Sequence, residues 1–380
     1  MKKNKQLIPG TAVQFIAITL LACLLKACLP GGNNEQLVEQ VKLAYRDIGP
    51  AQGLQPVAEQ RIKLAQCERS ALLNVRNLAV HGGAIYLLDA ERKGVFVFDM
   101  EGRFKRRIAR PGRGPGELLS PRDFVLNEVD GTLEILDWAL QEILVFSLQG
   151  EYRGSIELGE SYNALHKYPD KHYLFERSIS SFVFFGRDAT VLAEQSANQS
   201  MAYGTAEAKR FFFPASEQRI RDGTIRYNRN CFSAYKQGVL YWQMFDNNIY
   251  HLVRDHHLRT YVIDFGGRSI PDDILRMPMV QRLDHLNRPH VIARHKGMVN
   301  DVLGLNGSIV FSYLMGGEKQ IVLWKPDSGK AHHLEHPAFE LSELSLFGLS
   351  GNRFACLGYI TSDHSTEADL CLWLFELGEE

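Results

Sequence analysis

The stretch IYLLDAERKGVFVFDMEGRFKRRI (residues 85–108) returns 48 residues later as LEILDWALQEILVFSLQGEYRGSI (residues 133–156), and the two copies align without a gap. Six identities fall at this offset: Leu88, Asp89, Val97, Phe98, Gly102 and Ile108 match Leu136, Asp137, Val145, Phe146, Gly150 and Ile156. Conservative pairs lie between them, such as Phe104 with Tyr152. A constant spacing of this kind indicates an internal structural repeat.

Each copy predicts a run of short β-strands. An apolar run ends in an aspartate, a polar turn follows, and a second run ends at a turn that carries Gly102 or Gly150, where a positive φ is tolerated. A third run follows that turn, and residues 77–80 or 123–126 supply an earlier strand. Four strands per repeat of about 40 to 50 residues are typical of a β-propeller blade.

The pattern recurs more loosely over residues 162–192, 239–266, 308–334 and 353–377. The chain is therefore predicted to be all-β: a six-bladed β-propeller of four-stranded antiparallel blades that start near residues 73, 121, 160, 229, 300 and 345. Residues 57–67 hold a spare strand, which we expect to close the ring by joining the last blade. Two inserts are expected near 194–229 and 268–297, the second with the helix-start signals Ser269 and Pro271.

The N-terminus has the layout of a secretory signal peptide, with a basic start (residues 1–5) and an apolar core (residues 7–22). LLAC and LKAC both resemble the lipobox of bacterial lipoproteins, in which the cysteine is lipidated. Cys23 is favoured over Cys28, because Lys26 stands where that motif normally has a small or apolar residue. The expected organisation is a signal peptide at 1–22 (or 1–27), a lipid-anchored tether at 23–54 and the propeller at 55–380.

Charge and cysteine content exclude several classes of protein. The 43 basic and 44 acidic residues nearly cancel, so no net field would gather nucleic acid, and we expect membrane attachment only through the N-terminal lipid. Cys67, Cys231, Cys356 and Cys371 have no metal-type or redox-type spacing. Cys356 and Cys371 lie on neighbouring strand patterns, which leaves a disulfide or two buried thiols as alternatives.

The glycine-rich stretch RPGRGPGELLSPRDF (residues 110–124) does not match a nucleotide-binding loop, because no Lys-Ser/Thr pair follows its glycines. It joins two strand patterns and not a strand to a helix, so no helix N-terminus is available to an anion. We expect a connection between the first two blades. The alternative is that Arg113 and Glu117 line a binding surface.

Other motifs are better explained by structure than by chemistry. HHLEH (residues 332–336) matches a zinc motif that needs a helix, yet it ends a strand pattern and precedes Pro337. His285, His290 and His295 recur every five residues, which fits neither helix nor strand. Asp89 and Asp137, at equivalent repeat positions, are expected to serve their turns. No catalytic residue, metal site or cofactor is predicted.

The chain resembles the six-bladed β-propeller lipoproteins of Bacteroidetes, which are related to NHL-repeat propellers. The resemblance is carried by IYLLD (85–89), VFVFDMEGRF (95–104), GRGPGE (112–117), NNIYHL (247–252) and YVIDFG (261–266), and it covers roughly residues 55–378. Members are generally of unassigned function. The resemblance therefore implies an exported, membrane-anchored propeller and says little about its ligand.

These observations favour a binding or interaction module for a peptide, a glycan or an envelope protein over an enzyme, because loops from every blade converge at a propeller's channel mouth. The alternative is a metal-dependent propeller enzyme, lactonase-like or lyase-like, whose metal ligands would have to lie on the channel wall. The expected location is the cell envelope, as an outer-membrane lipoprotein. The periplasmic face is favoured, because the acidic surface-export signal found in some such lipoproteins does not follow the lipobox.

Overall fold

A computed structural model describes residues 38–50, 56–65, 71–177, 199–214, 231–243, 245–286, 288, 291, 298–315, 318–340, 342–361 and 368–377. Residues 39–380 form one compact unit. The predicted signal peptide and both lipobox cysteines, Cys23 and Cys28, lie outside the described residues, as do Cys67, His290 and His295.

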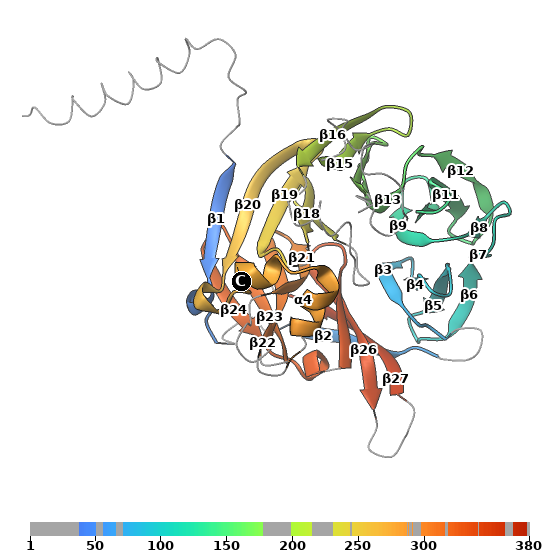
Figure 1. The fold of residues 1–380 in the computed structure, drawn as a ribbon. Coiled ribbons are helices and arrows are strands. Elements are labelled where there is room, and N and C mark those ends of the chain that lie inside the picture. Colours follow the sequence, from blue (N-terminus) through green and yellow to red (C-terminus); the bar gives the residue numbers. More distant parts are fainter. Residues whose placement is uncertain are drawn as a thin grey trace, which may run out of the picture. The chain divides into compact units, whose positions relative to one another are not determined.

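Six sheets follow one another along the chain, and we number them blades 1 to 6 (Figure 1). Blades 1 and 2 contain β3 (Val75–His81), β4 (Ala84–Asp89), β5 (Gly94–Asp99), β6 (Phe104–Ile108), β9 (Pro121–Asn127), β10 (Thr132–Asp137), β11 (Glu142–Ser147) and β12 (Tyr152–Glu157). Blades 3 and 4 contain β13 (Tyr162–Lys167), β14 (Tyr173–Arg177), β15 (Gln199–Gly204), β16 (Lys209–Pro214), β17 (Phe232–Tyr235), β18 (Gly238–Trp242), β19 (Asn248–Val253) and β20 (His256–Asp264). Blades 5 and 6 contain β21 (Val299–Leu305), β22 (Ser308–Met315), β23 (Glu318–Lys325), β24 (Lys330–Leu334), β25 (Ser342–Gly348), β26 (Arg353–Thr361) and β27 (Ala368–Glu376).

The first strands of the blades, β3, β9, β13, β17, β21 and β25, contact one another in that order, and β25 contacts β3, so the sheets close into a ring. Every blade is therefore sandwiched between two others, and its middle strands are buried on both faces. This explains why GVFVFD in β5 is buried along its full length and has few polar side chains. The predicted six-bladed fold is confirmed.

The ring is closed by a strand from the N-terminal side of the blades. β2 (Val57–Lys63) pairs antiparallel with β27 and completes blade 6 as its outermost strand. Ala65 then donates a backbone hydrogen bond of 2.8 Å to the carbonyl of Gly102 in blade 1. The prediction that residues 57–67 hold the closing strand is confirmed for β2, and the closure protects the edge of blade 6.

The expected insert at 194–229 is wrong in part. Residues 199–214 form β15 and β16, which are the third and fourth strands of blade 3, and RFFFP belongs to the outermost strand. The segment 178–192, which the sequence placed in this blade, lies outside the described residues. The repeat spacing is interrupted before these two strands, so the repeat did not predict them. β15 pairs with β14, and β16 pairs with β15.

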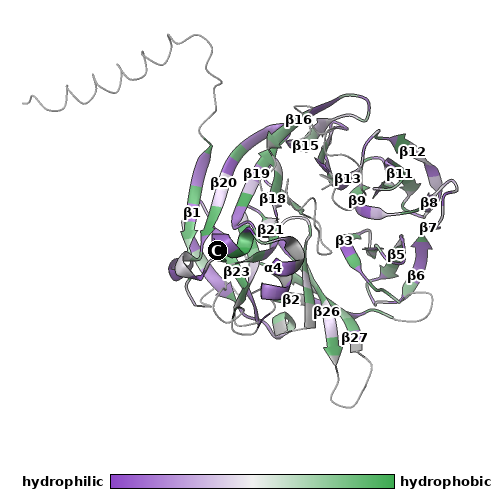
Figure 2. Ribbon diagram, in the orientation of Figure 1, coloured by the Kyte–Doolittle hydropathy of each residue, from purple (hydrophilic) through white to green (hydrophobic). Residues whose placement is uncertain are grey.

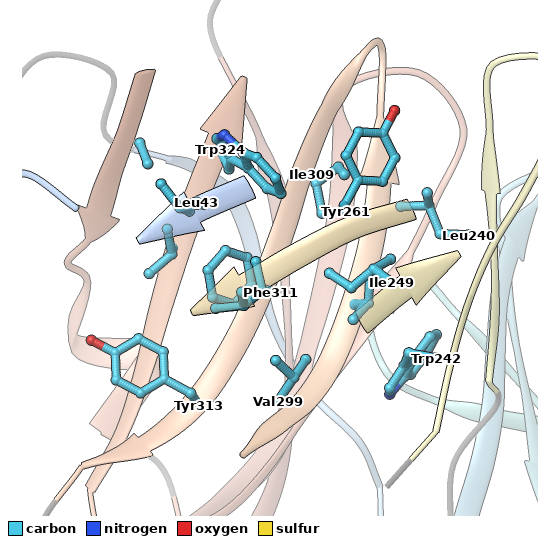
Figure 3. Packing of buried hydrophobic residues seen from close by; sticks show 14 of the residues in the cluster. Leu43, Leu240, Trp242, Ile249, Tyr261, Val299, Ile309, Phe311, Tyr313 and Trp324 are labelled. Atoms are coloured by element: carbon cyan, nitrogen blue, oxygen red, sulfur yellow. The ribbon is translucent and has the colours of Figure 1, made fainter. Parts of the chain in front are cut away.

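The expected tether at 23–54 also needs correction, because residues 39–49 belong to the folded unit. β1 (Glu39–Ala44) pairs in parallel with β20 as a fifth strand of blade 4, and Leu43 packs between blades 4 and 5 (Figure 3). The chain then passes blade 5, where Gly49 bonds to Ala331 and His333 of β24. We call residues 39–49 the N-terminal strap.

The connection from blade 4 to blade 5 carries two helices, α3 (Asp272–Leu275) and α4 (Met279–Leu286), within the insert expected at 268–297. Pro271 stands at the N-cap of α3, in line with its reading as a start signal. Among the described residues, no helix is both long enough and apolar enough to span a membrane.

Candidate functional site

The antiparallel blades divide their loops between two faces of the ring. Loops that follow the first and third strands of each blade emerge on one side, which we call face A. Loops that follow the second and fourth strands emerge on the other side, face B. The glycine-rich connection at 109–120 and the helices α3 and α4 therefore belong to face B.

The repeated aspartates organise the turns of face B. The Asp137 carboxylate accepts hydrogen bonds from four backbone N–H groups: Leu119 and Ser120 at Oδ2 (2.8 and 2.9 Å), and Ala139 and Leu140 at Oδ1 (both 3.0 Å). Asp89 makes the same set in blade 1, with Leu73, Asn74, Glu91 and Arg92. Both side chains are fully buried. The prediction that these aspartates serve their turns is confirmed.

The glycine-rich connection is held together from within by Glu117. Its Oε2 accepts the Gly114 N–H at 2.9 Å, and its Oε1 accepts Arg110 Nε at 3.1 Å. The Gly114 bond, followed by the Arg110 guanidinium, lowers the pKa of Glu117. Gly116 lies against the ring of Tyr152 on β12, which places the loop at the outer edge of blade 2, while the side chain of Arg113 is exposed.

The inner strands are joined by buried polar contacts. Asn77 of β3 donates to Asp123 Oδ1 at 2.7 Å, and Asp123 Oδ2 accepts the Leu165 N–H of β13 at 3.0 Å. Blades 2 and 3 are also joined by Glu134, which pairs with Lys167 at 2.5 Å and accepts the Tyr173 hydroxyl at 2.9 Å. These contacts fix the alignment of neighbouring blades, because a buried charge is tolerated only when it is paired.

Aromatic and charged side chains, of which Tyr168 is buried and the others are partly or well exposed, gather on face A across blades 3 and 4. They come from the β13–β14 loop (Tyr168, Asp170, His172), the end of β15 (Tyr203) and the β19–β20 turn (Arg254), and we call them the Tyr168–Arg254 cluster. The imidazole of His172 stacks on the Tyr203 ring at 5.3 Å with an interplanar angle of 14°. The Tyr168 ring meets Tyr203 edge-on at 5.8 Å.

Arg254 links the cluster across the blade boundary. Its guanidinium donates to the Tyr203 hydroxyl at 2.9 Å and pairs with Asp170 at 2.7 Å, and its backbone N–H donates to the Tyr168 hydroxyl at 2.7 Å. Burial raises the pKa of Tyr168. Burial opposes ionisation of Asp170, but the His172 N–H and the Arg254 charge outweigh it and lower the pKa of Asp170. The cluster is therefore preorganised, while His172 and Arg254 keep 38% and 51% of their side chains exposed.

A family model described as a domain of unknown function (DUF4934) matches residues 62–360. The chain belongs to the DUF4934 family. None of the curated proteins matches the sequence. The matched range begins at the end of β2 and ends in β26, so it covers blades 1 to 5 and part of blade 6, and it leaves out β27 and the N-terminal strap.

Solved structures share the fold of this DUF4934 chain. A Bacteroides fragilis NCTC 9343 protein described as exported is 14% identical with a TM-score of 0.64, over 90% of this chain and 100% of that chain. A member of the DUF4221 family from Bacteroides vulgatus ATCC 8482 is 11% identical with a TM-score of 0.54, over 86% of this chain and 99% of that chain. At such identities the similarity concerns the fold and not the chemistry.

The histidine motif of this DUF4934 member does not form a metal site. His332 and His333 lie on the strand β24, and His333 bonds the Tyr313 hydroxyl (2.8 Å) and the Gly49 carbonyl (3.0 Å). The His336 ring instead packs edge-on against Phe375. Across the part of the chain that the structure describes, no three His, Cys, Asp or Glu side chains converge to hold a metal ion.

The cysteine alternatives are also resolved for the described part of the DUF4934 fold. Cys356 and Cys371 are buried thiols on the paired strands β26 and β27, and they do not form a disulfide with each other. Burial raises the pKa of Cys356, which makes it an unreactive core residue. The disulfide alternative is therefore not realised between Cys356 and Cys371.

Sequence reasoning missed the Tyr168–Arg254 cluster. Its residues stand in turns of the weakest repeat copy and of the next blade, 86 positions apart at the widest contact. The only local signal was the pairing of aromatic with charged residues in YPDKH (168–172). The packing of blade 3 against blade 4 brings the three loops together, and that step cannot be read from the spacing.

Proposed function

We propose that the chain is an exported, lipid-anchored β-propeller that binds a peptide, a glycan or an envelope protein and does not transform it. The signal-like N-terminus with two lipobox cysteines supports export, and so does the relative from Bacteroides fragilis that is described as exported. With anchoring at Cys23, or alternatively Cys28, the protein would act at the envelope as an outer-membrane lipoprotein on the periplasmic side.

The Tyr168–Arg254 cluster is the observation that carries the binding role. Tyrosine and arginine supply much of the binding energy in protein interfaces, because they offer a large apolar area together with hydrogen-bonding tips. Here a hydrogen bond already holds Tyr203 and Arg254 in place, so binding a partner would cost little conformational entropy of these two side chains. The two blades present this surface on face A, apart from the turns that Asp89 and Asp137 hold on face B.

A binding screen tests the proposal. The purified full chain in mild detergent is titrated with peptide and glycan panels, and stabilisation is followed by thermal shift. With a hit in hand, His172→Ala and Tyr203→Ala are expected to weaken binding by about tenfold to a hundredfold, the range of an interface hot spot. His81→Ala is the matched control, because His81 is another half-exposed histidine of face A that pairs with an acid, Glu128.

Several outcomes would overturn the proposal. Equal binding by the three variants would remove the cluster from the site. A stoichiometric metal in the purified chain, with stabilisation by divalent ions and by no peptide or glycan, would favour the metal-dependent enzyme. Export and anchoring are tested separately by mass spectrometry of the mature N-terminus, where lipid on Cys23 is expected and lipid on Cys28 would identify the alternative site. An unmodified N-terminus would refute the anchor without touching the binding role.

A further inference from the structure

Blades 1 and 2 have the same fold and opposite charge. Residues 89–117 contain eight basic and five acidic side chains, whereas the equivalent residues 137–165 contain one basic and five acidic side chains. The strand pairing is also the same, including the register shift between the third and fourth strands. The fold therefore does not require the basic side chains of blade 1.

The excess lies along β6, the outermost strand of blade 1 (Figure 1), in the loop that follows it, and in the β4–β5 turn, whose carbonyls Arg107 of β6 contacts. Figure 2 shows that β6 is mostly hydrophilic. We call Arg92, Lys93, Lys105, Arg107, Arg110 and Arg113 the basic edge. At the equivalent positions of the second repeat stand Leu140, Gln141, Arg153, Ser155, Leu158 and Ser161.

Two guanidinium groups of the basic edge are held close together. Arg92 and Arg107 both lie over the buried ring of Phe96, at 5.8 and 5.2 Å from its centre. Arg107 donates to the backbone carbonyls of Arg92 and Lys93. Burial, and then the positive charge of Arg92, lower the pKa of Arg107, although an arginine stays charged in a protein. In blade 2 the equivalent positions hold the uncharged residues Leu140 and Ser155.

Several members of the basic edge are paired with acids in the described part of the chain. Asp99 is shared between Arg103 and Lys105, both at 2.8 Å, and Glu117 is used by Arg110 and the Gly114 N–H. The basic side chains of residues 89–117 still outnumber the acidic ones by three (eight against five), and the planar guanidinium fork suits carboxylate, sulfate or phosphate oxygens.

We propose that the basic edge binds an anionic polysaccharide. Lys105 and Arg107 lie two residues apart on β6, and Arg110 and Arg113 follow in the glycine-rich connection, so positive charges are distributed over a length of chain, which suits a linear polyanion. Among the described residues, the large exposed hydrophobic side chains (Val57, Leu73, Val129, Tyr152 and Leu258) include none on β6. The strand β6 itself therefore offers no large exposed apolar side chain for insertion into a lipid layer.

The test uses the purified full chain in mild detergent, with polygalacturonate and heparin as anionic probes and dextran as the neutral probe. Both anionic probes are expected to bind, with an affinity that falls steeply as salt rises, because exposed charges are screened. The variant Arg92→Leu/Lys93→Gln/Arg107→Ser carries the blade 2 residues at three positions, and its Kd is expected to rise at least about tenfold. Arg153→Gln removes a charge from blade 2 and should leave binding unchanged.

Each alternative result has a clear meaning. Wild-type affinity in a triple variant with an unchanged melting temperature would overturn the proposal, and so would equal binding of dextran. Binding to phosphatidylglycerol-containing mixed micelles, without binding to either polysaccharide, would reassign the edge to lipid headgroups and overturn it as well. The proposal does not rest on the Tyr168–Arg254 cluster, so Tyr203→Ala should bind heparin like the wild type.

Discussion

Replacing Asp137 by asparagine should destabilise the propeller strongly while preserving side-chain size. In the native chain, one carboxylate oxygen accepts the Leu119 and Ser120 N–H groups, and the other accepts those of Ala139 and Leu140. An amide has only one acceptor oxygen. Whichever way it is oriented, two of these partly buried N–H groups face an NH₂ donor instead.

The magnitude follows from the lost acceptors. A buried donor left without a partner costs about 1–3 kcal/mol, so two cost about 4 kcal/mol. The unfolding entropy of globular proteins is about 2.1 cal/mol/K per residue, which for roughly 340 folded residues gives a decrease in melting temperature of about 6 °C. Asp89→Asn should behave alike, because Asp89 makes the same four bonds in blade 1.

Thermal and urea unfolding followed by circular dichroism measure the effect. Asp130→Asn is the control in the same blade, because Asp130 is exposed and contacts only the Asn127 side chain in the described hydrogen bonds, so its change should stay within about 0.5 kcal/mol. A melting temperature for Asp137→Asn within 1 °C or so of the wild type would refute the structural role. The two aspartates would then become candidates for binding or chemistry.

Two further predictions concern a close approach and pH. Both Gly102 and Gly150 have a positive φ, but a Cβ at Gly102 would also overlap the Lys63 carbonyl of the closing strand. In urea titrations, Gly102→Ala should therefore lose about 2–4 kcal/mol of stability and Gly150→Ala only about 1 kcal/mol. Equal losses would contradict this prediction. Burial, together with the nearby charges of Lys236 and Arg259, lowers the pKa of His251 to about 4. As the pH falls below about 6.5, this histidine is therefore protonated in the unfolded chain before it is protonated in the folded chain. The free energy of unfolding should consequently decrease between about pH 6.5 and pH 4. His251→Gln should flatten part of this dependence in urea midpoints measured from pH 7 to 4.5, whereas an unchanged slope would assign it to other groups, such as His166.

Local patterns sufficed for much of the fold. The 48-residue offset placed the strands of blades 1 and 2, because alternation of buried strands and tight turns depends on neighbours in the chain. The role of Asp89 and Asp137 was equally accessible, since two of the four N–H groups that each aspartate binds belong to the turn directly after it. The glycine-rich connection was correctly placed between these blades for the same reason.

The pairing of strands that are far apart in the sequence could not be predicted from local patterns. Residues 199–214 are strands because β14 offers them an edge, and the repeat spacing gave no hint of this after an interruption. The N-terminal strap was mistaken for a tether, because β1 finds its partner β20 about two hundred residues further along the chain.

The sequence alone determined that the chain repeats, how many blades it builds, and which residues hold the turns, because those features rest on contacts within one repeat. Tertiary structure decided which strands complete blades 3 and 4, and which side chains from different blades meet on face A. It also showed that the charges of blade 1 lie along one edge, with Arg92 and Arg107 over the same ring. The physical reason is that strand pairing and the packing of strands and blades against one another bring together groups that are separated in sequence, and no local pattern encodes the distance between them.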